Sequence, residues 1–255
     1  MSLVRGALVL CVVAALAGCS RGASTAASPA ITPASSTPAS AGVAFTVAGV
    51  NPVHPNGSQD THAQTPDAEC DSATLARDKA VGVTVADGFA VTNFPVAAYL
   101  LRHFLSGDGT RVDYPAGSPI SKEAQASSAF QAVNNEVREA IMLGLKAGAA
   151  HVRLSAGQLP TVAFESKTSD LYWGFRGTQG LSVSGTGSRE NGRYVGTLSY
   201  VISDSYGFPA DDTLDGFGPP MRYLQTACGA PQHAGGARWF PDTITVTVPF
   251  SLPAG

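Results

Sequence analysis

The sequence predicts an α+β fold: a single domain with a mainly antiparallel sheet, two central helices and a β-hairpin in its C-terminal half. The helices are indicated by apolar residues that recur every three or four positions between residues 95 and 147. The hairpin is indicated by alternating runs on both sides of Asn191-Gly192, because Asn-Gly is the strongest short-range signal for a tight hairpin turn. Residues 243–248 alternate threonine with isoleucine or valine, which predicts a closing strand.

The first half of the chain contains two expected strands and both central helices. Alternation predicts strands at residues 43–47 and 81–85. Pro95 suits the first turn of a helix, which should end at Leu105 before a Ser-Gly-Asp-Gly run. A longer helix is expected from Ser121 to Ala147. Its apolar stripe consists of Phe130, Val133, Val137, Ile141 and Leu145.

Strands dominate the second half. They are expected at residues 161–165, 181–185 and 193–203, in addition to the closing strand. A short helix is expected at 219–226. The globular domain is then residues 43–255, about 210 residues, which is long enough to bury a core.

The N-terminus has the order of a secretory signal peptide: a positive charge at Arg5, an apolar run at 7–16 and then small residues. The sequence Leu16-Ala17-Gly18-Cys19 resembles the lipobox of bacterial lipoproteins. This resemblance implies that residues 1–18 are a signal peptide and that Cys19 becomes a lipidated mature N-terminus. The protein is then expected at the extracytoplasmic face of the cell membrane. An uncleaved anchor is the alternative, although the apolar run is shorter than the ~20 residues that cross a bilayer.

Residues 19–42 are expected to link the lipid to the domain. After Cys19 they are almost entirely serine, alanine, threonine, proline and glycine, with one charge at Arg21. Such a composition buries too little surface to offset the entropy of ordering, so we expect a disordered linker. Arginine outnumbers lysine twelve to four, which is typical of a GC-rich genome and favours an actinobacterial source.

Charge excludes one class of partner. The net charge is −3, and removal of residues 1–18 with Arg5 makes it −4. Because no run of lysine or arginine appears, we expect no binding to nucleic acid. The membrane is instead expected as a partner through the lipid anchor, since two acyl chains anchor a protein stably.

The four cysteines divide by position. Cys11 leaves with the signal peptide and Cys19 takes the lipid, which leaves Cys70 and Cys228. Outside the cytoplasm disulfides persist, so we predict that these two cysteines pair. Free thiols or a metal site are the alternatives, although neither cysteine has a neighbouring cysteine or histidine at ligand spacing.

The familiar catalytic and nucleotide-binding motifs are absent from the sequence, and we expect no cofactor and no metal. Residues 211–216 resemble the start of a calcium loop, but Arg222 stands where the twelfth position needs a carboxylate. A metal remains the alternative at a histidine and aspartate cluster in the first loop. That cluster consists of His54, Asp60, His62 and Asp67.

Asp204, Tyr206 and Arg222 are the candidate catalytic residues. Asp204 and Tyr206 follow the strand at 193–203 and lead into a loop rich in proline, glycine and aspartate, where catalytic groups are often displayed. Their Asp-x-Tyr spacing resembles part of the motif of the colicin M family, toxins that hydrolyse the lipid-linked peptidoglycan precursor at its pyrophosphate. In that family a second aspartate and a His-Arg pair follow. Gly207 stands at the aspartate position here and no His-Arg pair follows. The alternative is that Asp204 caps a turn and Tyr206 fills the core.

Aromatic residues offer a second candidate site. Tyr172 and Trp173, with Trp239 and Phe240, are candidates for a platform on which sugar rings stack, although aromatic residues more often fill cores. His103 is expected as a half-buried or exposed helix residue.

Two functions follow from these features. The first is a non-catalytic lipoprotein whose domain binds a cell-wall component or an envelope protein. The alternative is an envelope hydrolase of a phosphorylated or glycan substrate, in which Asp204 acts as acid, base or metal ligand and Arg222 neutralises developing charge. The second function requires Asp204, Tyr206 and Arg222 to meet in one pocket.

Overall fold

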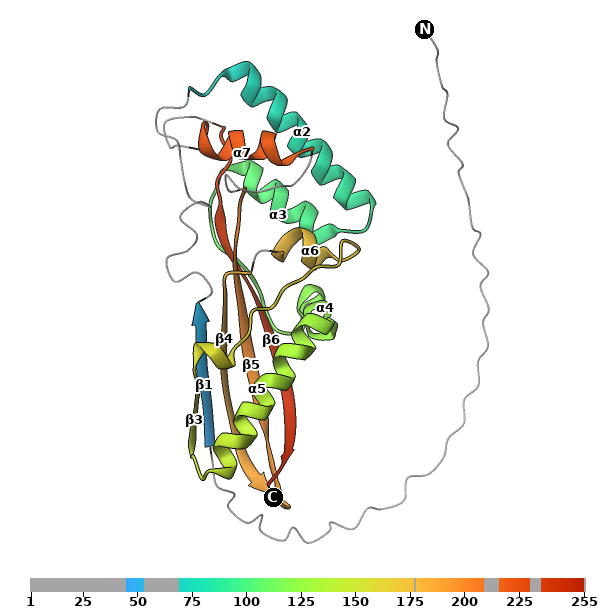
Figure 1. Ribbon diagram of the computed structural model, residues 1–255. Coiled ribbons are helices and arrows are strands. Elements are labelled where there is room, and N and C mark those ends of the chain that lie inside the picture. The colour runs from blue at the N-terminus through green and yellow to red at the C-terminus, as the bar shows by residue number, and fades with distance from the viewer. Residues whose placement is uncertain (1–44, 53–68, 177, 209–215, 230–234, 255) are drawn as a thin grey trace, which may run out of the picture. The chain divides into compact units, whose positions relative to one another are not determined.

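The computed structural model describes residues 45–52, 69–176, 178–208, 216–229 and 235–254, all within one compact unit, Ser40–Gly255 (Figure 1). The expected signal peptide, Cys19 and the linker at 19–42 lie outside the described residues. So do the cluster from His54 to Asp67 and the acidic residues 211–215.

A six-stranded sheet organises the domain. Its strand order is β2-β6-β5-β4-β1-β3, in which β1 pairs with β3 and β2 with β6 in parallel, and the other three pairs are antiparallel. The mainly antiparallel α+β fold predicted from the sequence is therefore confirmed. The strands are β1 (Phe45–Pro52), β2 (Val112–Tyr114), β3 (His151–Leu154), β4 (Gly180–Glu190), β5 (Arg193–Tyr206) and β6 (Phe240–Pro253).

The expected hairpin is formed by β4 and β5, which pair along their whole length from Glu190 opposite Arg193. The two turn residues have positive φ, 48° at Asn191 and 75° at Gly192. A tight hairpin turn with this twist needs left-handed conformations at both positions, and asparagine and glycine adopt them at least cost.

The central helices also form, with one difference. Helix α3 spans Pro95–Ser106, one residue beyond its expected end at Leu105. The long helix expected at 121–147 is divided into α4 (Pro119–Ala126) and α5 (Ser128–Lys146), because Ser127 is extended with ψ at 144°. The Ser127 hydroxyl accepts a hydrogen bond from the Phe130 amide, so this residue caps a new helix.

The strand expected at 81–85 is wrong. These residues lie inside α2 (Ser72–Val91), whose first turn is capped by Asp71. Helix α2 buries Gly82, Ala86 and Phe89 at helical spacing, while Val83 is exposed. Two of these buried residues, Gly82 and Ala86, are small and add little hydrophobic signal, whereas the valines that suggested a strand do not all face the core.

The strand expected at 161–165 is also wrong, because these residues pair with no strand among the described residues. They follow the short 3₁₀ helix η1 (Ala156–Gln158) and precede α6 (Asp170–Phe175). Their burial nevertheless alternates, with Val162 and Phe164 buried between exposed neighbours, which indicates an extended backbone. The short helix expected at 219–226 is present as α7 (Gly218–Thr226).

Helices cover one face of the sheet. Figure 1 shows α5 running along the strands, where it contacts β3 and β6, and Phe130 of its stripe packs on Tyr200 of β5 with ring centroids 5.1 Å apart. A buried hydrogen bond of 2.9 Å from the Tyr200 hydroxyl to Asn134 Oδ1 joins β5 to α5. The alternate residues of the strands are small and largely hydroxyl-bearing, including Ser184, Thr186, Thr197 and Thr247, which are exposed. Among the described helices, none has both the length and the apolar composition needed to cross a membrane.

Candidate functional site

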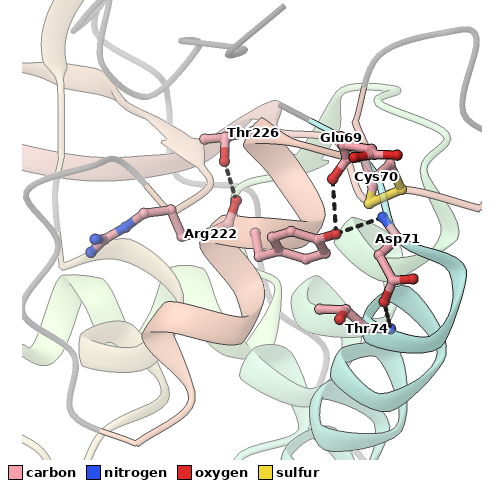
Figure 2. The surroundings of a disulfide bond; sticks show 8 residues. Glu69, Cys70, Asp71, Thr74, Arg222 and Thr226 are labelled. Atoms are coloured by element: carbon pink, nitrogen blue, oxygen red, sulfur yellow. Dashed lines mark hydrogen bonds between the residues drawn. A yellow bond between two sulfur atoms is a disulfide. The ribbon is translucent and has the colours of Figure 1, made fainter. Parts of the chain in front are cut away.

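Cys70 and Cys228 form the predicted disulfide, with their Cα atoms 5.0 Å apart (Figure 2). Cys70 lies two residues before α2 and Cys228 two residues after α7, so the bond joins the ends of these helices across 158 positions of sequence. Tyr223 adds a second connection, because its hydroxyl accepts a hydrogen bond from the Asp71 amide and donates one to the Glu69 carbonyl. This corner of the domain is therefore fixed both covalently and by hydrogen bonds.

Arg222 lies on α7, next to Tyr223. Figure 2 shows its side chain directed away from the disulfide, and its backbone carbonyl accepts a hydrogen bond from the Thr226 hydroxyl. The structure places Arg222 on α7, whereas Asp204 and Tyr206 lie on β5. Among the described residues, Arg222 is not one of the groups that shift the pKa of Asp204.

Asp204 and Tyr206 both point inward from β5, where the strand continues beyond the expected end at residue 203. Tyr206 is 7% exposed and stacks on Phe240, with ring centroids 5.4 Å apart. Asp204 lies directly opposite Asp242 of β6 in the antiparallel register. It is 8% exposed, and Asp242 has no exposed surface.

Burial dominates the electrostatics of this aspartate pair. Loss of solvation raises the pKa of Asp204 to about 7, although the Ser205 amide that donates to its Oδ1 acts in the opposite direction. Burial and the neighbouring Asp204 raise the pKa of Asp242 well above its usual value. Two adjacent buried carboxyl groups are most stable when they retain a proton. The pair is therefore at least partly protonated at neutral pH.

Around Asp242, buried polar atoms lack partners among the described residues. Within this part of the chain neither of its carboxyl oxygens has a hydrogen-bond partner in another residue, and the same holds for the hydroxyl of Tyr114 on β2. Burial raises the pKa of Tyr114, and the charge of Asp242 adds to that shift. Asp242 was missed by the sequence analysis because the expected strand began at residue 243. Its position two residues before Ile244 in an alternating run was the available signal.

Tyr172 and Trp173 are on α6 and pack against the core. Tyr172 is 9% exposed, so it presents little ring surface to a ligand. Trp173 is half-buried, with its ring 4.8 Å from that of Tyr172 and 5.3 Å from that of Phe89. Its Nε1 donates to the Lys167 carbonyl. Trp173 therefore packs α6 against Phe89 of α2.

The remaining candidates are also in packed positions. Phe240 is buried and Trp239 is half-buried. His103 is half-buried, as expected, with its Nε2 2.8 Å from the Thr110 carbonyl oxygen and its ring against Phe240. Across the described part of the chain, no three histidine, cysteine, aspartate or glutamate residues are grouped so that they could hold a metal ion.

In the described part of the chain, a groove of about 780 Å³ lies between helices α4 and α5 and the extended segment at 160–166. Its floor includes the buried side chains of Val133, Phe164 and Leu171. Its walls are mostly alanine and serine. Three glutamates lie on different walls: Glu123 on α4, Glu136 on α5 and Glu165 on the extended segment.

The groove carries only negative charge. Its lining, all of it within the described residues, contains the three glutamates and no lysine, arginine or histidine. Glu123 accepts a hydrogen bond of 2.6 Å from the Ser169 hydroxyl, which ties α4 to the residue before α6. The sequence analysis did not identify this site, because its residues come from two separate stretches, 123–136 and 160–171, that share no motif. Neither Asp204 nor Asp242 lines it.

Comparison of the chain with protein-family models, with curated proteins and with solved structures found no match.

Proposed function

We propose that this protein is a non-catalytic binding module of the bacterial cell envelope, held at the extracytoplasmic face of the membrane by lipid on Cys19. The observation that carries the proposal is the groove between α4, α5 and residues 160–166. A concave site with an apolar floor and a few polar groups is the usual form of a binding site. The ligand is a cell-wall component or an envelope protein.

The disulfide supports the proposed location. Disulfides persist in oxidising compartments and are rare in the cytosol. The bond between Cys70 and Cys228 is in keeping with a domain that works outside the cytoplasmic membrane.

Burial of the aspartate pair favours binding over hydrolysis. A general acid or base must come within hydrogen-bond reach of the substrate. Asp204 is almost fully buried against Asp242 and does not line the groove, and Arg222 lies on another element. The envelope hydrolase built on these residues therefore has less support than the binding module.

Co-sedimentation with purified envelope tests the proposal. The compact unit Ser40–Gly255 is mixed with envelope that contains peptidoglycan and its lipid-linked precursor, and the pellet is assayed for protein and the supernatant for released fragments. Ala132→Trp fills the groove from the exposed side of α5, and Ala76→Trp places the same ring on an exposed position of α2 as a matched control.

We expect the wild-type unit and Ala76→Trp to pellet with the envelope and Ala132→Trp to remain in the supernatant. Equal pelleting of both variants would remove the groove from the proposal. Released fragments that disappear with Asp204→Ala would establish the hydrolase instead. Circular dichroism of each variant confirms that it is folded.

A further inference from the structure

We infer that the groove binds an extended, positively charged polypeptide segment, which adds as a strand to residues 161–165. This inference rests on the proposed function and names the class of its ligand. It is carried by three observations: an unused backbone edge, a wall charge of one sign, and walls made mostly of small side chains.

The backbone edge comes from the segment that the sequence analysis expected to be a strand. In an extended chain the N–H and C=O groups of successive residues point to opposite edges. The Val162 carbonyl accepts a hydrogen bond from the Thr178 hydroxyl, so that edge is occupied. By the same alternation, the backbone N–H and C=O groups of Thr161, Ala163 and Glu165 point to the other edge.

That second edge faces no partner strand. Thr161, Ala163 and Glu165 are exposed, line the groove, and form no backbone hydrogen bond to any other described residue. An unpaired edge of this kind is a template for an added strand, in which main-chain hydrogen bonds supply affinity and pockets for alternate side chains supply specificity.

Charge selects the kind of segment. Glu123, Glu136 and Glu165 surround the groove from three elements, and no basic residue in the lining offsets them. The three glutamates would attract a ligand that carries ammonium or guanidinium groups at alternate positions, and they would repel an acidic ligand.

Side-chain size favours a polypeptide over a sugar. The walls carry alanine and serine, including Ala129, Ala132 and Ala163, which leave room for a second backbone. Phe164 is the one aromatic residue in the lining, and it is 4% exposed. A glycan would therefore find no exposed ring on which to stack.

Fluorescence anisotropy with labelled peptides tests the inference. The main probe is a short peptide of alternating lysine and valine. A second peptide replaces lysine with glutamate, and a third carries N-methyl groups on the backbone amides of alternate residues, which removes the donors of one edge. The protein variants are Glu136→Gln with Glu165→Gln and, as a matched control, Glu139→Gln, an exposed position of α5 outside the groove. Glu123 is left intact because it bonds to Ser169.

We expect the lysine peptide to bind, the glutamate peptide not to bind, and N-methylation of the paired edge to abolish binding. The double variant should bind about tenfold more weakly, in line with two partly exposed ion pairs, and Glu139→Gln should bind as the wild type does. Equal binding of the lysine and glutamate peptides, or of the methylated peptide, would overturn the inference.

The two proposals fail separately. If no lysine peptide binds while envelope pelleting still depends on Ala132, the ligand is not a cationic segment, but the binding function stands. If the peptides bind as expected and the envelope does not pellet the protein, the groove recognises such segments but the envelope is not their source.

Discussion

Asp204 of β5 and Asp242 of β6 lie directly opposite each other in the antiparallel register, and both point into the core. Directly opposite side chains on neighbouring strands are close enough to interact, and like charges in such positions destabilise a sheet. Retention of a proton removes that repulsion. The stability of the domain should therefore depend on pH through this pair.

The domain should be more stable at pH 5 than at pH 8. In the unfolded chain both carboxyl groups lose their protons near pH 4, whereas in the folded chain Asp204 retains its proton up to about pH 7 and the pKa of Asp242 is also raised. The folded state thus binds more protons between these values. Stability falls as pH rises, by about 1.4 kcal/mol for each pH unit and each retained proton. Urea denaturation midpoints at the two pH values measure this difference, and a higher midpoint at pH 8 would contradict it.

Asp242→Asn should stabilise the domain at pH 8. Asparagine keeps the shape of the side chain, removes one negative charge and can donate to the Asp204 carboxylate. We expect a gain of about 1–3 kcal/mol and a weaker dependence of the urea midpoint on pH. Asp87→Asn is the matched control, because Asp87 is exposed and its ion pair with Arg102 contributes little. A loss of stability at pH 8 in Asp242→Asn alone would show that the carboxylate has a favourable partner.

Local signals account for what the sequence predicted correctly. The Asn191-Gly192 hairpin depends on two left-handed residues, and α3 depends on Pro95 and on Gly107 at its end with φ at 72°. Each of these features is encoded within a few positions. The stripe of α5 likewise lies within one helix, so its period identified the buried face.

Tertiary contacts decided what the sequence could not predict. Gly82 of α2 lies against Leu105 and Met221, and this close approach of helices makes a small residue the core-facing one. The extended segment at 161–165 has the alternation of a strand, but nothing local determines whether a partner strand is present. The groove needs α4, α5 and that segment together, and the Asp204–Asp242 pair needs the register of two strands.

Removal of the disulfide should destabilise the domain strongly. Cys70 and Cys228 close a loop of 158 positions, for which the chain-entropy model gives about 5 kcal/mol as an upper value. We expect Cys70→Ser with Cys228→Ser to unfold at a much lower urea concentration than the wild type. The wild type under reducing conditions should match the variant. Equal midpoints with and without the bond would mean that Tyr223 and its hydrogen bonds to residues 69 and 71 suffice to hold this corner.

Tyr200→Phe should destabilise the domain more than its small change in volume suggests. The Tyr200 hydroxyl donates to Asn134 Oδ1 at 2.9 Å, and both residues are buried. Its removal leaves a buried amide oxygen without this donor, which costs about 1–3 kcal/mol. Tyr194→Phe is the matched control, because that hydroxyl is partly buried and donates over 3.3 Å to the Leu145 carbonyl.

Adding Asn134→Leu to Tyr200→Phe removes the amide that has lost its donor and should recover part of the lost stability, because replacing both partners of a buried hydrogen bond by apolar groups is nearly neutral. Additive losses in this double-mutant cycle would show that Asn134 and Tyr200 stabilise the domain independently rather than through their shared hydrogen bond.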